Sequence, residues 1–211
     1  MTRDLWIVGA SGFGREVEHL VRAINERQET RRIVGFVDDA PSDENRQLVE
    51  ALGHRVVGGV DALLEREPAH YVIGIGSGSV RRAIDSRLIE TGWQAAVLVH
   101  PDTSLGHDVV LGPGSVVCAG VRATTNIRCG RHVHLNLNTT VGHDTYLGDY
   151  VTINPLVAIS GGVWLGEAAM VGTSAAVLQY LSLGAQSVVG AGSVVVRDVP
   201  ENVTVKGVPA R

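Results

Sequence analysis

From Leu135 to Val171 the chain reads LNLNTT VGHDTY LGDYVT INPLVA ISGGVW LGEAAM V, and each group of six opens on leucine, valine or isoleucine. The same period runs from Val99 to Val195, where 15 of the 17 leading positions hold Ile, Leu or Val. A helix repeats every 3.6 residues and a strand every two, so neither produces this pattern. A six-residue repeat with an aliphatic leader is typical of a parallel β-helix.

The hexads predict a three-sided coil in which three groups of six residues complete one turn. The leading aliphatic side chains then point inward, and residues one coil apart become neighbours. Glycine follows the leader nine times, and we expect it there because it tolerates backbone conformations that other residues resist. Aromatic residues make up only 4% of the chain, which suits a narrow interior. The alternative is a β-sandwich with accidental six-residue spacing.

Residues 1–98 have a different rhythm, in which strands alternate with helices. A strand is expected at Leu5–Val8, and Gly9-Ala10-Ser11-Gly12-Phe13-Gly14 opens a helix whose apolar residues repeat at helical spacing. Further strands are expected at 33–37, 71–76 and 95–98, with helices at 46–52 and 80–90. The predicted fold is α/β plus all-β: a small Rossmann-like domain over residues 1–98 with a parallel sheet, then a β-helix over 99–211.

The composition argues against several classes of protein. The 18 basic and 22 acidic residues give a net charge of −4, which offers no general attraction to nucleic acid or to an anionic membrane. Residues 168–196 carry no charge, but glycines and polar residues interrupt them too often for a membrane-spanning helix. Two cysteines are too few for a disulfide framework, and the apolar stretch near the start is too short for a secretory signal. We therefore expect a cytoplasmic protein.

Several motifs stand in a fixed order along the whole chain. They are residues 9–17 (GASGFGREV), Phe36-Val37-Asp38-Asp39, His100-Pro101, residues 136–148 and Lys206–Ala210. Together they resemble the bacterial sugar acyltransferases of the sialic-acid O-acetyltransferase (NeuD) and amino-sugar N-acetyltransferase (PglD) type. The resemblance implies a left-handed β-helix, a homotrimer with active sites between subunits, and acetyl-CoA as the donor.

Histidine is suited to remove the acceptor's proton during acyl transfer, because its ordinary pKa is about 6.5. Two hexads carry the same tripeptide, Gly106-His107-Asp108 and Gly142-His143-Asp144, so both histidines fall in one column of the β-helix. One coil beyond His143 the column holds Gly161, which has no side chain to block a thioester and has an N–H that could face its carbonyl oxygen. We therefore assign His143 as the base, Asp144 as its orienting carboxylate and Gly161 as the oxyanion donor. The alternatives are that His143 is a solvated corner residue and that Asp144 only forms a turn. The resemblance agrees, because the family's catalytic histidine is also followed by an acidic residue.

The Gly-rich turn after the first strand suits a phosphate, since backbone N–H groups and the helix dipole favour an anion there. The resemblance implies that this domain holds a nucleotide-linked sugar, with the diphosphate on Gly9, Ser11, Gly12 and Gly14. Asp38 and Asp39 would accept hydrogen bonds from the base or the sugar, and Gly76 would lie near the same crevice. Otherwise these glycines only permit tight turns.

Three further positions concern the substrates. Asn136 precedes His143 by seven residues, as in the family, and is expected either to contact the substrate or to cap a turn. Phe13 and Thr152 stand where many relatives have histidine, at places that the resemblance puts near the acceptor or the donor, and we expect Phe13 to bind the acceptor and Thr152 the donor. These two departures indicate a different acceptor or a different pose.

Acetyl-CoA is expected along the C-terminal coils. Its pantetheine arm would follow a groove between two β-helices, lined by small residues such as Gly172, Ala175 and Gly190, while Lys206 would meet a phosphate or be solvated. No metal is expected. A zinc carbonic anhydrase on this fold needs three imidazoles around one metal, and the β-helix histidines include no pair five residues apart.

The function that fits best is acetyl-CoA-dependent acetylation of an amino group on a nucleotide-linked sugar, by direct attack. One alternative is O-acetylation of sialic acid or another sugar hydroxyl. The alternative from another class is a nucleotide-sugar-binding scaffold without turnover.

Overall fold

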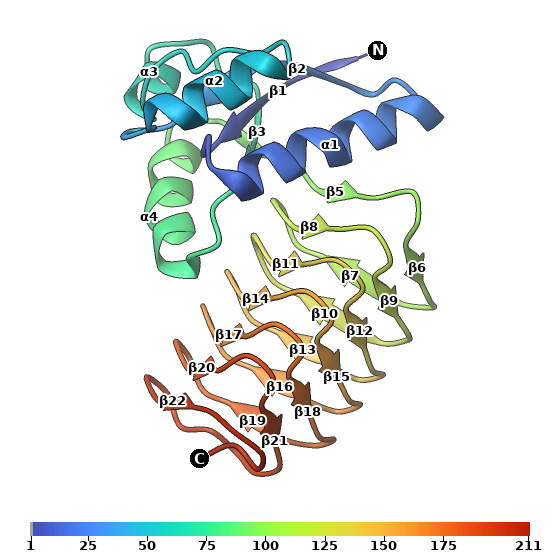
Figure 1. Ribbon diagram of the computed structural model, residues 1–211. Coiled ribbons are helices and arrows are strands. Elements are labelled where there is room, and N and C mark those ends of the chain that lie inside the picture. The colour runs from blue at the N-terminus through green and yellow to red at the C-terminus, as the bar shows by residue number, and fades with distance from the viewer. Residues whose placement is uncertain (1) are drawn as a thin grey trace.

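A four-stranded parallel sheet of order β2-β1-β3-β4 and its helices form the first part of the chain in the computed structural model, which describes residues 2–211 (Figure 1). The elements are β1 (Arg3–Val8), α1 (Gly12–Arg27), β2 (Arg31–Val37), α2 (Asp43–Ala51), α3 (Asp61–Leu64), β3 (His70–Ile73), α4 (Gly78–Ile89) and β4 (Gln94–Ala95). The short helix α3 was not expected from the sequence. The strand expected at 95–98 is shorter, because Leu98 already pairs within the β-helix.

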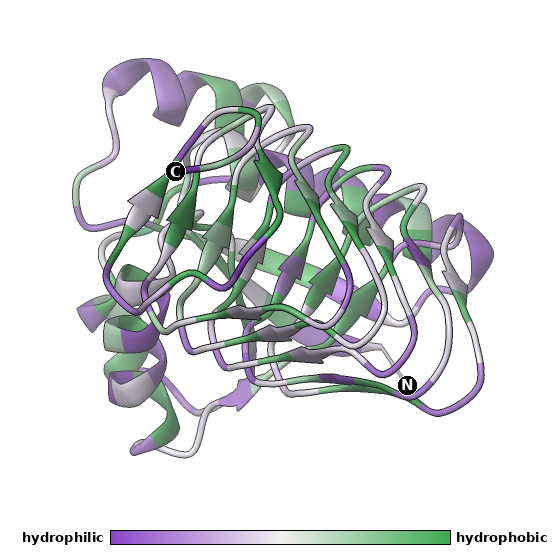
Figure 2. Cartoon of the chain, turned by 90° about the horizontal axis from the view of Figure 1, so that it is seen from below, coloured by the Kyte–Doolittle hydropathy of each residue, from purple (hydrophilic) through white to green (hydrophobic). Residues whose placement is uncertain are grey.

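The second part is a parallel β-helix whose strands stack in three sheets, and Figure 2 shows the three-sided outline of its coils. The seven-stranded sheet holds β5 (Leu98–Val99), β8 (Val116–Val117), β11 (His134–Leu135), β14 (Thr152–Ile153), β17 (Met170–Val171), β20 (Val188–Val189) and β22 (Thr204–Val205). The six-stranded sheet holds β6 (Ser104–Leu105), β9 (Arg122–Ala123), β12 (Thr140–Val141), β15 (Ala158–Ile159), β18 (Ala176–Val177) and β21 (Val194–Val195). The five-stranded sheet holds β7 (Val109–Leu111), β10 (Ile127–Cys129), β13 (Tyr146–Leu147), β16 (Trp164–Leu165) and β19 (Ser182–Leu183).

The predicted fold class, a small parallel-sheet part followed by a left-handed parallel β-helix, is confirmed. Strand pairs such as His134 with Thr152 join residues one coil apart, as the hexads predict. The leading aliphatic residues, among them Leu147 and Leu165, are completely buried and form the core of the β-helix.

The reason expected for the glycines after each leader was wrong. The left-handed backbone occurs two residues later in the hexad, as at Asp144 with a φ of 57°. Gly142 is required for a different reason, because a Cβ there would lie 2.5 Å from the backbone N of Gly161 in the next coil. Successive coils approach too closely at this place for a side chain.

The first part of the chain packs on the outer face of the seven-stranded sheet. The outward side chains of Val116, His134 and Thr152 are buried there, whereas that of Thr204 in the last coil is exposed. Leu20 of α1 belongs to the same hydrophobic cluster as Val116. The contact between the two parts therefore runs along the first coils.

The uncharged residues 168–196 form coils of the β-helix from β17 to β21. Their aliphatic side chains, such as those of Val177 and Leu183, lie in its core. No helix within residues 2–211 has both the length and the apolar character needed to cross a membrane.

Candidate active site

His143 and Asp144 lie at the corner between β12 and β13, where the chain turns from the six-stranded to the five-stranded sheet. His143 Nδ1 is 2.7 Å from Asp144 Oδ2, and the two side chains are 53% and 58% exposed. The Asn126 amide donates to the other Asp144 oxygen at 3.0 Å. These hydrogen bonds, first from Asn126 and then from His143, hold the pKa of Asp144 below its ordinary value. The Asp144 anion can therefore keep a proton on Nδ1 and leave Nε2 free to act as a base.

Gly161 lies directly beside this imidazole, as the spacing of one coil predicts. A Cβ built on Gly161 would be 2.4 Å from His143 Nε2. The Gly161 carbonyl accepts a hydrogen bond from the Tyr180 N–H at 3.0 Å, but its own N–H donates none within residues 2–211. His107 stands in the same column beside Thr125, so it lacks a bare neighbour. The corner thus joins an oriented imidazole to an unpaired backbone donor.

The Gly-rich turn between β1 and α1 contains two kinds of residue. Gly9 has a φ of 104°, and a Cβ on Gly14 would lie 1.9 Å from the Gly9 carbonyl oxygen. By contrast, no atom lies within 4 Å of the Cβ position of Gly12, and the Ser11 side chain makes no capping hydrogen bond. Gly9 and Gly14 therefore hold the turn together, while Ser11 and Gly12 form its open side.

Asp38 and Asp39 both accept hydrogen bonds from backbone N–H groups near this turn. Asp38 accepts hydrogen bonds from the N–H groups of Ala10 at 2.8 Å and Ala40 at 3.0 Å. Asp39 accepts one from the Val60 N–H at 2.7 Å. The two carboxylates fix the loops at the carboxyl end of the sheet, and each keeps further lone pairs for a ligand.

A cavity of about 180 Å³ lies between α1, the loop after β3 and the outer face of β11 and β14, and we call it the interdomain cavity. Phe13, Gly76, Asn136 and Thr152 line it together. Thr152 Oγ1 donates to the Gly76 carbonyl, and Asn136 Nδ2 donates to the Ile153 carbonyl, each at 2.9 Å. Thr152, which we expected near the donor, thus lies among residues expected at the acceptor.

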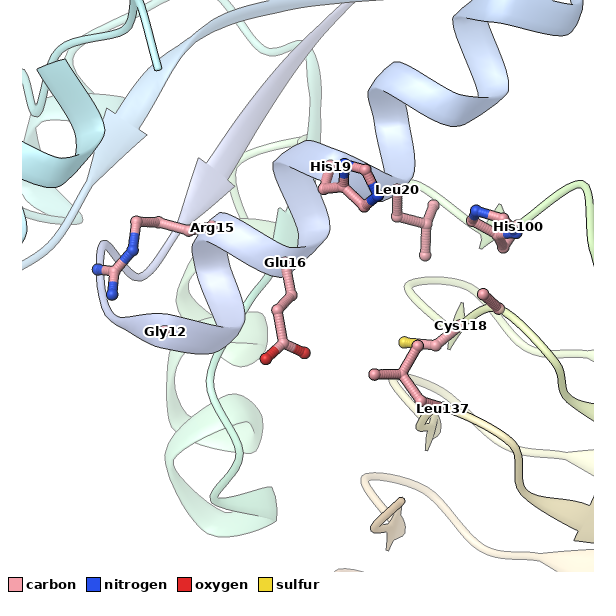
Figure 3. Close-up of a pocket in the computed structure, with 9 residues that line it drawn as sticks. Gly12, Arg15, Glu16, His19, Leu20, His100, Cys118 and Leu137 are labelled. Carbon is pink, nitrogen blue, oxygen red and sulfur yellow. The ribbon is translucent and has the colours of Figure 1, made fainter. Parts of the chain in front are cut away.

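A larger cleft of about 470 Å³ opens between α1 and the first coils (Figure 3). Glu16 and His19 of α1 lie on one side, and His100 and Cys118 of the β-helix lie on the other. Glu16 also lines the interdomain cavity, so the two spaces meet at this side chain. The cleft has the volume of an ordinary small-molecule site.

The residues expected to bind the donor do not come together within one chain. Gly172, Gly190 and Lys206 follow β17, β20 and β22, and a Cβ on Gly190 would lie 3.0 Å from the Lys206 Cβ. Gly161 lies on another corner of the β-helix. The role expected for Ala175 was wrong, because its side chain occupies an inward hexad position and is 1% exposed in the core.

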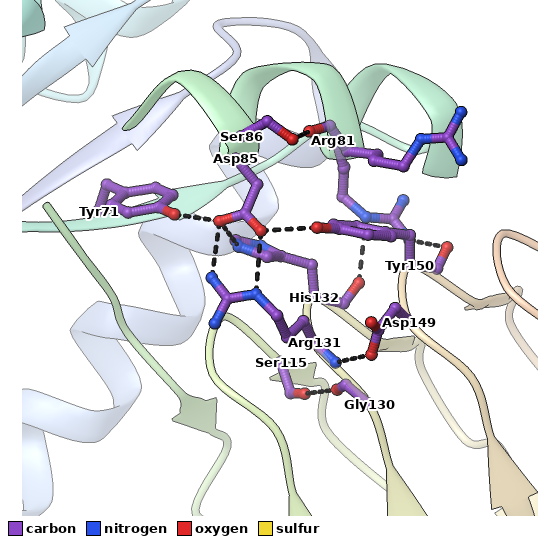
Figure 4. A network of polar contacts seen from close by, with 11 residues as sticks. Tyr71, Arg81, Asp85, Ser86, Ser115, Gly130, Arg131, His132, Asp149 and Tyr150 are labelled. Atoms are coloured by element: carbon purple, nitrogen blue, oxygen red, sulfur yellow. Dashed lines mark hydrogen bonds and ion pairs between the residues drawn. The ribbon is translucent and has the colours of Figure 1, made fainter. Parts of the chain in front are cut away.

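Two charged residues of α4 join the parts of the chain in a buried network (Figure 4). Arg81 is completely buried, and its guanidinium donates only to backbone carbonyls: those of Ile75, Gly76, His132, Tyr150 and Val151. Asp85 is 2% exposed and is hydrogen-bonded by the side chains of Tyr71, Arg131, His132 and Tyr150. Burial alone would raise the pKa of Asp85, but the hydrogen bonds from His132 and Arg131 outweigh it and lower that pKa well below its ordinary value.

Sequence reasoning missed this network and the buried side chain of His134. Arg81 and Asp85 stand four residues apart on a helix, a spacing typical of a solvated ion pair. A signal for a covered face was nevertheless present. Read every 18 residues, the outward positions of the seven-stranded sheet include Leu98, Val116, Met170 and Val188, which form an apolar stripe around His134.

The base and the interdomain cavity lie at two different corners of the β-helix. The side of the coil that contains β12 separates Asn136 from His143. Five extended residues along this side span about 17 Å, which is roughly the length of the side. Among residues 2–211 no group of three or more His, Cys, Asp or Glu side chains is placed to hold a metal ion. The corner at His143 offers proton transfer, and the corner at Asn136 offers a space for a ligand.

Comparisons with known proteins find relatives over nearly the whole length of the chain. Residues 4–88 match the family model of the PglD N-terminal domain. The chain is 28% identical over 202 residues to the GDP-perosamine N-acetyltransferase of Escherichia coli O157:H7, covering 95% of this chain and 81% of that protein. The crystal structure of PerB from Caulobacter crescentus with CoA and GDP-perosamine is 32% identical, with a TM-score of 0.87 and coverage of 99% and 96% of the two chains. The acetyltransferase domain of PglB from Neisseria gonorrhoeae with acetyl coenzyme A is 28% identical, with a TM-score of 0.84 and coverage of 100% and 99%.

Proposed function

Because the chain belongs to the family of hexapeptide-repeat sugar acetyltransferases that includes PerB, we propose that it acetylates the amino group of a nucleotide-linked sugar. Membership makes it a sugar acyltransferase with acetyl-CoA as its donor. The observation that supports the finer proposal is the position of His143 Nε2 against the bare main chain of Gly161. His143 Nε2 and the unpaired Gly161 N–H belong to the same corner, and direct transfer between two bound substrates requires a base and an oxyanion donor close together.

In the proposed reaction the sugar amine attacks the thioester carbonyl carbon. The amine proton passes to His143 Nε2, the C–S bond breaks, and the imidazolium gives the proton to the leaving sulfur, so that CoA is released as the free thiol. Asp144 keeps the proton on Nδ1, which leaves the lone pair on Nε2, and it stabilises the imidazolium that forms. The Gly161 N–H donates to the negative charge that develops on the carbonyl oxygen. A Cβ on Gly161 would fill this space, so the glycine fits the thioester.

The nucleotide part of the acceptor would bind at the first sheet. Ser11 and Gly12 offer an open N-terminus on a helix of 16 residues, which suits the diphosphate. Asp38 and Asp39 lie nearby at the end of β2 and can accept hydrogen bonds from the base or the ribose. GDP-perosamine is the first acceptor to test, because PerB was solved with it and the Escherichia coli relative is named for it.

We propose that the working site forms between two copies in a homotrimer. Direct attack needs the reacting atoms about 3–3.5 Å apart, whereas one side of the β-helix, about 17 Å long, separates Asn136 from His143. A sugar in the interdomain cavity of one copy can meet His143 only if a second copy brings it there. The donor residues support the same arrangement, because Gly161 and Gly172 occupy different corners of one chain.

The test is release of free thiol from acetyl-CoA with GDP-perosamine and with a panel of UDP-, GDP- and dTDP-linked amino sugars. The wild type should turn over at least one of them. His143→Asn should lower kcat by about 10² to 10⁴-fold, the contribution usual for a general base, with the KM for acetyl-CoA and the Tm unchanged. A loss of only a few-fold would rule out His143 as the base. Thiol release with sialic acid and with none of the amino sugars would show O-transfer instead.

A further inference from the structure

His134 is the buried polar side chain that the network and the proposed mechanism leave unused. It is 1% exposed, in the outward position of β11, and it lines the interdomain cavity. Neither of its ring nitrogens makes a hydrogen bond of ordinary geometry within residues 2–211, although the Ile73 backbone lies close to the ring. A buried polar group without a partner lowers stability, so such a group calls for an explanation.

The environment of His134 keeps the ring neutral. Burial, with smaller contributions from the charges of Arg81 and His132, lowers the pKa of His134 well below its ordinary value, and the contact with the Ile73 backbone offsets this only in part. A neutral imidazole has one N–H donor and one acceptor nitrogen. A hydroxyl group, which both donates and accepts, is complementary to it.

The rest of the interdomain cavity presents both acceptors and donors. The side-chain amides of Asn136 and Asn154 each use one N–H on a carbonyl of the next coil, at 2.9 Å, and keep a second N–H, while the Thr152 hydroxyl donates to Gly76. Glu16 lines the cavity with a carboxylate that makes no hydrogen bond within residues 2–211. A ligand with hydroxyl groups, which both donate and accept, fits this lining, whereas a phosphate would lie against the Glu16 carboxylate.

We infer that the interdomain cavity holds the sugar ring of the acceptor and that His134 recognises one of its ring hydroxyls, as a specificity residue for the proposed reaction. This inference rests on the proposed function. The half-buried Phe13 ring lies over the imidazole, with the ring centroids 4.8 Å apart. For a hydroxyl to reach the nitrogens, the Phe13 ring must move to another rotamer, a side-chain change common on binding.

The test uses His134→Leu, which removes both nitrogens and keeps an apolar side chain of similar size. Since the unpartnered imidazole lowers stability, the Tm should rise by a few degrees. The KM for GDP-perosamine should rise about tenfold, the effect of one lost hydrogen bond, with the KM for acetyl-CoA unchanged. Acceptor analogues that each lack one ring hydroxyl identify the partner: the wild type should discriminate against one of them, and His134→Leu should not.

Two variants separate recognition from packing. His134→Gln, which retains a donor and an acceptor, should recover part of the acceptor affinity, and His107→Leu, at an exposed corner, should change neither KM. A raised Tm with an unchanged KM for GDP-perosamine in His134→Leu would overturn the inference. If the wild type transfers no acetyl group to GDP-perosamine, the proposed function fails for that acceptor, and calorimetric binding of the same compound decides about His134. Weaker binding by His134→Leu then supports the inference, and equal Kd values or no binding by the wild type overturn it.

Discussion

Gly161→Ala tests the position of the base without altering any titratable group. The new Cβ would lie 2.4 Å from His143 Nε2, whereas ordinary contact begins at 3.4 Å, so the imidazole must retreat by about 1 Å. The ring is 53% exposed and can swing into solvent, and Gly161 does not have a positive φ, so the fold should tolerate alanine. A misplacement of about 1 Å can cost about 10²-fold in rate, which corresponds to about 2.7 kcal/mol in the activation barrier.

The assay is thiol release from acetyl-CoA with the acceptor that the wild type turns over. We expect kcat to fall about 10²-fold, with the Tm within about 2 °C of the wild type. Gln179→Ala is the matched control, because Gln179 is exposed in the same column one coil beyond Gly161 and does not contact the imidazole. If Gly161→Ala retained a third of the wild-type kcat, the contact between His143 and Gly161 would not matter for catalysis.

Two further predictions concern the junction of the two parts and the shared site. Asp85→Asn should lower the free energy of unfolding at pH 7 by about 3 kcal/mol, the cost of breaking a buried ion pair. Because the native pKa of Asp85 is depressed, its contribution is present above about pH 4 and disappears as the pH falls through the lower native pKa, so calorimetric scans of wild type and variant should converge in acid. The other prediction concerns the proposed site between two copies. Gly12→Trp blocks the cleft between α1 and the first coils. Co-expression of this variant with His143→Asn should restore roughly a quarter of the wild-type activity in randomly mixed trimers. Activity no greater than that of the separate variants would show that each site lies within one chain.

The hexad period was sufficient to predict the β-helix and its register, because side chains one coil apart pair regardless of what covers them. The contact of His143 with Gly161 follows from that register alone. The reason for the glycines could not be predicted from this period. The sequence shows that a side chain is absent, but it does not show whether the backbone torsion or a neighbouring coil rules out that side chain. At Gly142 the neighbouring coil is the cause.

The junction between the two parts was beyond prediction for a different reason. Whether Arg81 faces solvent or carbonyl groups depends on how the first sheet is placed on the β-helix, and no local pattern encodes that placement. The same holds for Thr152, whose hydroxyl binds Gly76 only because the loop after β3 lies over β14. Contacts between separate elements could not be predicted from the sequence, whereas contacts between residues that repeat within the β-helix could.

The Arg81 junction explains how a cavity between two parts of a chain can be selective. Its guanidinium donates to Ile75 and Gly76 on one side and to three carbonyls of the β-helix on the other, at distances of 2.6–3.2 Å. If the first sheet pivoted away, a buried charge and several carbonyls would lose their partners together, which is a large penalty in a medium of low dielectric constant. Gly76, which lines the interdomain cavity, is therefore held at a fixed distance from Thr152. Selectivity then depends on which side chains line a space whose two walls keep a fixed separation, and replacing His134 should change the choice of sugar without changing the way the two parts fit together.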